Sequence, residues 1–402
     1  MSRSAPEVSD RHRAASVVAR RAGIFTESVI REMTRLAREA NAINLAQGFP
    51  DFPMPPSMKE AACAAIVSDI NQYAITWGST SLRRAIAEKY QRVYGMTVDP
   101  EREITVTCGA TEAMAATFLA LIDPGDEVII FAPFYENYGP DAILADARPV
   151  WVHLQPPSWS IDWAALERAF TSRTRALVLN TPHNPTGRVF TREEVTRIAE
   201  LCESHGVIVV TDEPYEHIVY EGAHNVIATW PRMYERSVTI SSLSKTFSCT
   251  GWRLGYAIAE PRRTDAIRKV HDFLTVGAPA PLQRAAVAGF ALGADYYAAL
   301  VGGYRERRGI LAAALADGGF IFTLPEGAYY ILADFTALSD ADDRKFAEWL
   351  ARECGVAAVP GSSFYPDKET GAGRRCVRFA FCKQRETLER AAERLARVAS
   401  RV

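Results

Sequence analysis

Residues 207–215 read Val-Ile-Val-Val-Thr-Asp-Glu-Pro-Tyr, a continuously apolar and β-branched run that ends in acidic and aromatic residues. A run of this kind is expected for a strand covered by helices on both faces, because a half-exposed strand would alternate apolar and polar residues. Similar short runs occur at 104–107, 127–131, 176–179 and 238–240. The chain is therefore predicted to contain an α/β domain.

Helix-like segments lie between these runs and would supply the crossovers from strand to strand. They are expected at 111–121, 162–170 and 191–204. The last of them begins with a capping box, in which Thr191 and Glu194 satisfy each other's backbone N–H groups.

The pattern changes after about residue 290 to long helices rich in Ala and Arg, with strands near 328–333 and 377–381. This change predicts a second, smaller α+β domain. The expected division is a flexible arm (1–22), an N-terminal segment that joins the small domain (23–52), a large domain (53–290) and a small domain (291–402).

Composition narrows the class of protein and its partners. The apolar share of 48% and charged share of 23% are those of an ordinary globular protein. A net charge of −2 gives no basic field for nucleic acid. Seven cysteines, with no C-x-x-C pair, argue against a disulfide framework or a zinc site. With no apolar run of membrane-spanning length and no secretory signal, we expect no membrane partner and a cytoplasmic location.

Lys245 is the first candidate for chemistry. It lies in Ser241-Ser242-Leu243-Ser244-Lys245-Thr246-Phe247, directly after the run at 238–240, and Arg253 follows shortly. A lysine amine can form a Schiff base with an aldehyde, and its pKa falls when it is desolvated near a second cation. The serines and the arginine would suit a dianionic phosphate.

Two further strand ends carry polar side chains. Because the carboxyl ends of parallel strands open into the ligand crevice, Asp212 could keep a pyridinium nitrogen protonated, and Tyr215 could donate to a phenolate oxygen. The alternative is that Asp212 caps the next segment and Tyr215 packs. Asn184 lies in the tightly specified turn 180–187, where it could offer its amide to a ring oxygen.

Residues 108–112, Cys-Gly-Ala-Thr-Glu, join a strand to a helix whose free N–H groups and dipole would hold a phosphate. No further glycines follow at the dinucleotide-binding spacing, and the chain has no G-x-x-x-x-G-K-[ST] motif. Interpretations as an NAD-binding or P-loop protein therefore lose support.

In order and spacing these motifs resemble the class I aminotransferases, which are pyridoxal-phosphate (PLP) enzymes of fold type I. The resemblance runs from Gly23 to Val402. It implies the aspartate aminotransferase-like fold of PLP-dependent transferases, with a mostly parallel seven-stranded sheet in the large domain and a smaller α+β domain. The matching residues are Gly48, Tyr73, Gly109, Ala110, Thr111, Tyr135, Asn184, Asp212, Tyr215, Ser242, Ser244, Lys245, Arg253 and Arg378.

The resemblance also implies a role for each residue. Lys245 would carry PLP as a Schiff base and shuttle the proton, with Asp212 on the pyridinium nitrogen, Asn184 and Tyr215 on the ring oxygen, and Tyr135 stacked on the ring. The phosphate would lie on the 109–111 turn (Gly109, Ala110, Thr111), Ser242, Ser244 and Arg253. The substrate would contact Gly48, Asn184, Arg378 and Tyr329, with Arg378 on its carboxylate. Tyr73 would reach the phosphate of the neighbouring subunit, which implies a homodimer. No metal is expected.

Within the family, the chain looks most like the glutamine transaminase K, kynurenine and methionine aminotransferase branch, whose members often cleave cysteine S-conjugates. It departs from that branch at Val276-Gly277, where an aromatic residue and a histidine are usual. The predicted activity moves the α-amino group of an L-amino acid to a 2-oxo acid through a quinonoid.

Two other functions stay open. One is a PLP-dependent C–S β-lyase that yields thiol, pyruvate and ammonia from a cysteine S-conjugate. The other, more remote, is a non-catalytic PLP-binding regulatory domain, which would need a DNA-binding head where only 22 residues precede Gly23.

Overall fold

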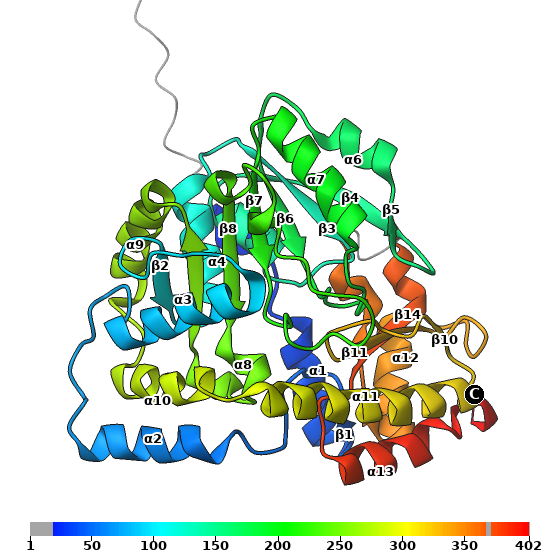
Figure 1. Cartoon of the computed structure of the whole chain (residues 1–402). Coiled ribbons are helices and arrows are strands. Elements are labelled where there is room, and N and C mark those ends of the chain that lie inside the picture. Colours follow the sequence, from blue (N-terminus) through cyan, green and yellow to red (C-terminus); the bar gives the residue numbers. More distant parts are fainter. Residues whose placement is uncertain (1–18, 367–370, 402) are drawn as a thin grey trace, which may run out of the picture.

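The computed structural model describes residues 19–366 and 371–401 (Figure 1). The five predicted apolar runs all form strands of its main sheet. The strand order is β2 (Ile104–Thr107), β9 (Gly255–Ala259), β8 (Ser237–Ser242), β7 (Ile208–Asp212), β6 (Thr174–Asn180), β3 (Glu127–Ala132), β4 (Arg148–Gln155) and β5 (Ser160–Ile161). Pairing is parallel from β8 through β4, whereas β9 and β5 run antiparallel to their neighbours. The mostly parallel sheet is confirmed, but it has eight strands where seven were predicted, because the two-residue β5 extends it at one edge.

Burial on both faces explains the continuous apolar sequence of the predicted strands β2, β3, β6, β7 and β8, whereas β4 is partly exposed. Alternate residues of β3, β6 and β7 enter different buried clusters. Ile130 and Val210 pack in the cluster that includes residues of α4 (Ala110–Leu121) and α9 (Pro261–Thr275), whereas Ile129 and Val209 pack with residues of α6 (Trp163–Ala169) and α7 (Arg192–Ser204). Since each fully buried aliphatic side chain stabilises the fold by about 1.5–3 kcal/mol, both layers contribute to holding the sheet.

A third buried cluster covers the β2–β9 side of the sheet. It includes residues of α2 (Pro56–Val67), α3 (Thr80–Tyr94) and α10 (Ala280–Phe290), packed on Ile104, Tyr256 and Ile258. Figure 1 shows α3 in front of the sheet and α2 and α10 below it.

The predicted capping box at the start of α7 is present. Thr191 Oγ1 accepts a hydrogen bond from Glu194 N at 3.2 Å, and Glu194 Oε2 accepts one from Thr191 N at 2.9 Å. The predicted helix at 111–121 begins at Ala110, after Gly109 turns the chain with φ of 85°.

The C-terminal part forms a second sheet, as predicted. Its order is β10 (Ile321–Phe322), β11 (Tyr330–Asp334), β14 (Cys376–Ala380) and β13 (Val359–Pro360). Three α-helices accompany it, namely α11 (Ala294–Asp317), α12 (Asp343–Trp349), which continues into a π-helical turn at Leu350–Cys354, and α13 (Arg385–Leu395). β1 (Ile43–Asn44), after α1 (Val29–Glu39), pairs in parallel with β12 (Val356–Ala357). The N-terminal segment thus joins the C-terminal elements.

The remaining elements are short: α5 (Tyr138–Leu144), α8 (Leu243–Thr246) and 3₁₀ turns at Arg20–Gly23, Ile227–Thr229, Tyr234–Arg236, Thr250–Trp252, Gly361–Phe364, Ala372–Arg375 and Val398–Ser400. Most of the predicted flexible arm, residues 1–18, lies outside the described residues. The division at 53–290 and 291–402 stays a prediction, with the main sheet lying within 104–259 and the second within 321–380.

Two sequence expectations concern partners and compartment. All seven cysteines are free thiols, and four of them are buried. Among the described helices, none is by itself long and apolar enough to cross a membrane, and α10 and α11 would pass that test only as a pair bent by 93°.

Candidate active site

Four strand ends line up at one edge of the main sheet and bring the predicted residues together. Thr107 and Ser242 both pair with Gly255, at the start of β9, and Asn180 pairs with Asp212. The segments that follow these strands carry Gly109, Asn184 and Lys245. Polar residues at four strand ends therefore lie close together at one edge of the sheet. These are the ends of the sequence runs at 104–107, 176–179, 207–211 and 238–240.

Lys245 lies in the single turn of α8, which Ser242 caps by accepting a hydrogen bond from Ser244 N at 3.0 Å. Its Nζ donates to the carbonyl oxygen of Gly48 at 3.2 Å. Burial is the main cause that lowers the pKa of Lys245 to about 8, and the charge of Arg253 acts in the same direction. An amine with this pKa is neutral in a useful fraction near physiological pH.

Asp212 is buried at the end of β7 and has one satisfied and one unsatisfied oxygen. Oδ2 accepts a hydrogen bond from Tyr138 Oη at 2.6 Å, whereas Oδ1 has no partner within the described chain. Burial raises the pKa of Asp212 to about 6, against the Tyr138 hydrogen bond and the charge of Lys245, which lower it. A buried carboxylate oxygen without a partner is costly unless a donor or cation meets it.

The expected phosphate cradle lies where α4 begins. Gly109 has φ of 85°, and a Cβ on it would lie 2.6 Å from Arg253 Nη2. A Cβ on Gly255 would lie 2.4 Å from the backbone nitrogen of Ala110. These two close approaches require glycine and set the guanidinium of Arg253 against the free N–H groups at the start of the helix.

The two serine hydroxyl groups of this cradle differ in their hydrogen bonding. Ser242 Oγ is 3.4 Å from the Leu254 carbonyl oxygen, and Ser244 Oγ is buried without a partner among the described residues. Thr111 is the second residue of α4. A phosphate here would satisfy the Ser244 hydroxyl and the first helical N–H groups together.

Arg378 is buried on β14 and faces the same site. Its Nη1 donates to Asn184 Oδ1 at 2.7 Å and its Nη2 to the Ala46 carbonyl oxygen at 3.0 Å, while Nε has no partner in the described part of the chain. The guanidinium lies over the rings of Tyr330 and Phe364, at 4.2 and 4.7 Å from their centroids. A guanidinium held in a fixed orientation, with Nε still able to donate a hydrogen bond, suits a carboxylate ligand.

Aromatic side chains enclose the space between Lys245 and Arg378. Tyr215 Oη is 3.0 Å from Tyr330 Oη, and Tyr329 Oη donates to the Gly48 carbonyl oxygen at 2.9 Å. A Cβ on Gly48 would lie 2.1 Å from Tyr330 Oη, so glycine is required at position 48. Tyr135 stands edge-on to Tyr138, with ring centroids 5.8 Å apart.

Tyr73 is the predicted residue that does not join this cluster within the chain. It is 86% exposed on the surface. His183 and Cys249, which lie beside the motifs, are buried, and His183 Nδ1 is 2.8 Å from Thr186 Oγ1.

Sequence reasoning missed three side chains of the site. Tyr138 holds Asp212, and Tyr330 holds Tyr215. Lys383, also buried, donates to the carbonyl oxygens of Gln47 and Phe49 on either side of Gly48. Tyr138 lies only three residues after Tyr135 in the sequence, whereas the Lys383 contact depends on residues more than 330 positions apart.

Comparison with known proteins agrees with this site. The family model for "Aminotransferase class I and II" matches residues 40–395. The chain belongs to the class I and II aminotransferases. A probable N-succinyldiaminopimelate aminotransferase of Mycobacterium tuberculosis is 41% identical over 386 residues, covering 94% of this chain and 97% of that protein. The methionine aminotransferase of Escherichia coli is 39% identical over 369 residues, covering 92% and 95%.

Solved structures of aminotransferases share the fold as well. That of the M. tuberculosis N-succinyldiaminopimelate aminotransferase superposes with a TM-score of 0.92 at 41% identity, over 95% of this chain and 100% of the other. The human kynurenine–oxoglutarate transaminase 1 is 35% identical over 396 residues, covering 90% and 94%. The predicted branch is thereby confirmed, as is the aspartate aminotransferase-like fold.

Enzymes of this family depend on PLP, and the residues present fit that cofactor. The partnerless Oδ1 of Asp212 would meet the pyridinium N–H, and the partnerless hydroxyl of Ser244 would meet the phosphate. The missing Cβ atoms of Gly109 and Gly255 keep the cradle open to Arg253 and Ala110. Each otherwise costly feature is accounted for by one part of the cofactor.

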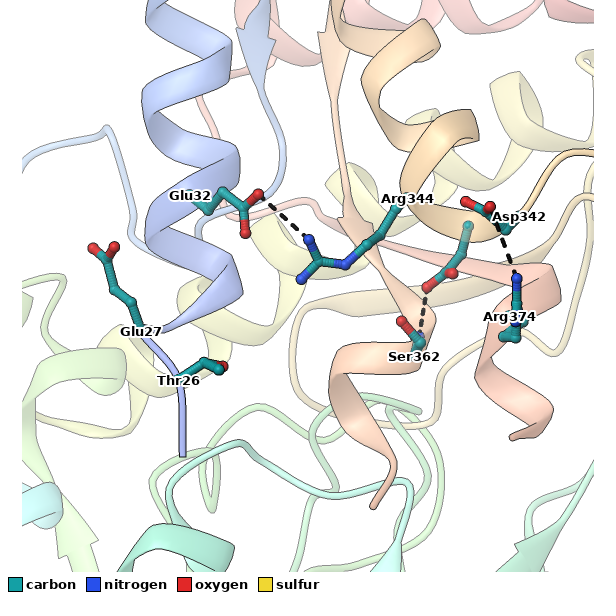
Figure 2. A pocket seen from close by; sticks show the side chains of 8 residues that line it. Thr26, Glu27, Glu32, Asp342, Arg344, Ser362 and Arg374 are labelled. Atoms are coloured by element: carbon teal, nitrogen blue, oxygen red, sulfur yellow. Dashed lines mark hydrogen bonds and ion pairs between the residues drawn. The ribbon is translucent and has the colours of Figure 1, made fainter. Parts of the chain in front are cut away.

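A cavity of about 470 Å³ lies elsewhere, between α1, α12 and the 3₁₀ turns at Gly361–Phe364 and Ala372–Arg375 (Figure 2). Arg344 approaches Glu32 at 3.5 Å across it, and Arg374 approaches Asp342 at 3.8 Å. None of the predicted site residues lines this cavity. It is separate from the Lys245 cluster.

Proposed function

We propose that Lys245 holds PLP and moves the proton between the substrate Cα and the cofactor while an α-amino group passes from an L-amino acid to a 2-oxo acid. The observation that carries this proposal is the pair formed by Lys245, whose pKa is lowered to about 8, and Asp212, whose Oδ1 is buried and without a partner in the described chain. Both lie on adjacent strand ends of an aminotransferase fold.

When bound, PLP supplies an aldehyde that condenses with amines and a ring that accepts electrons from the substrate Cα. Asp212 would keep the ring nitrogen protonated, and Tyr138 would hold Asp212 in place through Oδ2. Lys245, once released as a neutral amine, would take the Cα proton, because its pKa lies near the working pH.

The other residues bind and orient. Arg378 would grip the substrate carboxylate with its unused Nε and the outer edge of its fork. Asn184 and Tyr215 would hold the ring oxygen, and Tyr135 would cover the ring. Tyr329 fixes the Gly48 carbonyl, which also receives the Lys245 N–H. Gly109, Ala110, Thr111, Ser242, Ser244 and Arg253 would hold the phosphate.

The protein is proposed to act as a homodimer. Tyr73 is 86% exposed, and apolar side chains around it in sequence are exposed too, including Val67 at 83% and Ile75 at 49%. Phe273, at the end of α9, is 93% exposed. Large apolar side chains left in water support a subunit interface, and Tyr73 would reach the partner's phosphate from it.

The donor is proposed to be an L-amino acid of the kind named for the relatives, which act on N-succinyldiaminopimelate, methionine or kynurenine. Val276 and Gly277 offer no aromatic ring to a substrate side chain. Free cysteines in place of disulfides support the predicted cytoplasmic location.

A Lys245→Ala variant tests the central assignment. We expect loss of the visible absorption band of the lysine-bound cofactor and a fall in kcat of at least about 100-fold, since the proton carrier is removed. Lys269→Ala, whose side chain is 73% exposed on α9, is the matched control and should keep both. A Lys245→Ala protein with the band and the rate intact would refute the assignment.

A panel of L-amino acids identifies the donor and separates the two reactions. Transfer requires a 2-oxo acid acceptor, so bleaching of the band by a donor should be reversed by the acceptor. With an S-substituted cysteine and no 2-oxo acid, pyruvate beyond one turnover would show β-elimination and would contradict amino transfer as the sole activity.

A further inference from the structure

His271 is a buried side chain that the predicted mechanism does not use, and both of its ring nitrogens are engaged. It lies on α9, with Nδ1 2.6 Å from Glu112 Oε1 and Nε2 2.7 Å from the carbonyl oxygen of Thr76. Glu112 belongs to α4 and Thr76 to the loop between α2 and α3. The ring therefore bridges three separate segments of the chain.

The partners of this ring define its charge. A carbonyl oxygen only accepts, so Nε2 carries a proton. The other oxygen of Glu112 accepts the backbone N–H of Cys108 at 2.7 Å, so both of its carboxyl oxygens are engaged. Thr275 Oγ1 lies 3.3 Å from the same nitrogen. An acceptor therefore faces each ring nitrogen of His271, an arrangement that favours the doubly protonated ring.

The charges around His271 favour the same state. Burial, the largest influence, would lower its pKa, but the hydrogen bond and charge of Glu112, the Thr76 carbonyl and the charge of Asp272 on α9 itself outweigh burial, and the pKa is raised. The nearby Cys108 thiol has a pKa raised by burial and by Glu112.

Each end of this bridge belongs to a cofactor-binding segment. Glu112 is the third residue of α4 and, through Cys108 N, fixes the turn that enters Gly109. Thr76 follows Tyr73 by three residues, and the next carbonyl in the loop, that of Trp77, accepts Val106 N at 3.0 Å. The phosphate cradle and the Tyr73 loop therefore meet through one side chain.

We infer that His271 is a positioning residue that ties the phosphate cradle of its own subunit to the loop carrying Tyr73 toward the partner's phosphate. The inference rests on the proposed function, which places PLP on Lys245 and Tyr73 across the dimer. In its protonated form His271 holds Glu112 and Thr76 together. Losing the Nδ1 proton leaves a lone pair facing the carboxylate and loosens the link.

His271→Gln in the holoenzyme tests this inference through the dissociation constant of PLP, measured across pH. We expect PLP to bind about tenfold more weakly in the variant at low pH, where the wild type keeps both charge-assisted hydrogen bonds. The difference should shrink as pH rises through the raised pKa of His271, because the wild type then loses its own second proton. His205→Gln, an exposed histidine at the end of α7, is the control and should match the wild type.

Glu112→Gln serves as a second variant, in case His271→Gln does not fold. It removes the charge that favours the protonated form of His271. The midpoint of the pH dependence of the PLP dissociation constant should therefore shift to lower pH. A ratio of dissociation constants near one, or one that does not vary with pH, would overturn the inference. Failure of the wild type to load PLP on Lys245 would instead overturn the proposed function.

A double-mutant cycle with Tyr73→Phe tests the link between the two subunits. If His271 acts through the Tyr73 loop, the losses of PLP affinity in the two single variants should not add in the double variant. If the losses in PLP binding free energy add strictly, His271 and Tyr73 act independently. That result would contradict the proposed link between them.

Discussion

At the scale of single residues, the site is marked by buried polar atoms that have no hydrogen-bond partner in the described chain. Asp212 Oδ1, Ser244 Oγ and Arg378 Nε are buried without partners in the described chain, and they face a ring nitrogen, a phosphate and a carboxylate, respectively, in the proposed arrangement. Neighbours hold each of these side chains in place. Tyr138 and Asn184 make the contacts that fix Asp212 and Arg378.

Asp212→Asn removes the carboxylate that would keep the ring nitrogen protonated. We expect kcat for amino transfer to fall by at least about 100-fold, with the fold retained, because the amide is nearly isosteric with the carboxylate. Steady-state kinetics measure the effect. Asp265→Asn, whose side chain is 67% exposed on α9, is the control. A rate equal to that of the wild type would remove Asp212 from the mechanism.

Asp141 provides a pH test that does not involve chemistry. It is buried on α5, its Oδ2 has no partner among the described residues, and burial raises its pKa to about 8. A carboxyl whose folded pKa is raised costs stability as pH rises from its unfolded value toward that pKa. Asp141→Asn should therefore be more stable than the wild type near pH 8 by about 1–3 kcal/mol, and the gain should vanish near pH 4.

Denaturant unfolding at the two pH values measures this difference. Asp126→Asn, outside the main site between α4 and β3, is a convenient control. An equal effect of Asp141→Asn at both pH values would show that Asp141 is not held neutral by burial.

At the scale of elements, the cradle depends on how α4 begins. Gly109→Ala should weaken PLP binding by about tenfold or more, because its Cβ would lie 2.6 Å from Arg253 Nη2 at the phosphate position. Gly125→Ala is a closely matched control, since Gly125 also has φ of 87° but open space around it. Both variants bear the backbone strain, and only the first should lose PLP affinity in a binding titration.

The sequence revealed five strands of the main sheet, β2, β3, β6, β7 and β8, and missed β4, β5 and β9. Strands β3, β6, β7 and β8 are buried on both faces, so apolar continuity reveals them. β4 was missed because several of its residues are exposed or half-buried, and β9 because Gly-Tyr-Ala-Ile-Ala has weak strand propensity. The antiparallel pairing of β9 to β2 joins residues some 150 positions apart, so local sequence carries no signal for it.

The residues of the candidate site likewise divide into those that the sequence predicts and those that it does not. Residues in motifs at strand ends, such as Asn184 and Lys245, could be predicted from the chain and its family resemblance. Tyr330 and Lys383 could not, because they reach the site from the C-terminal part through contacts with Tyr215 and with the carbonyls beside Gly48. Local sequence carries no signal for such long-range pairs.

At the scale of the whole molecule, the exposed apolar side chains near Tyr73 predict a dimer. Phe273→Asp places a charge on a side chain that is 93% exposed in the single chain. Burying that charge at an interface should raise the dimer dissociation constant by at least about 30-fold. Sedimentation velocity over a concentration series measures it. Ile321→Asp, at a residue 61% exposed on β10, should leave the dimer intact, and equal behaviour of both variants would exclude this face as the interface.

The most direct test of the central claim is to reduce the PLP-loaded protein with borohydride and map the modified peptide by mass spectrometry. Reduction fixes the cofactor to the amine that holds it. We expect a phosphopyridoxyl group on Lys245, in the peptide that follows β8. The same group on another lysine, or none on Lys245 in protein that retains PLP, would contradict it.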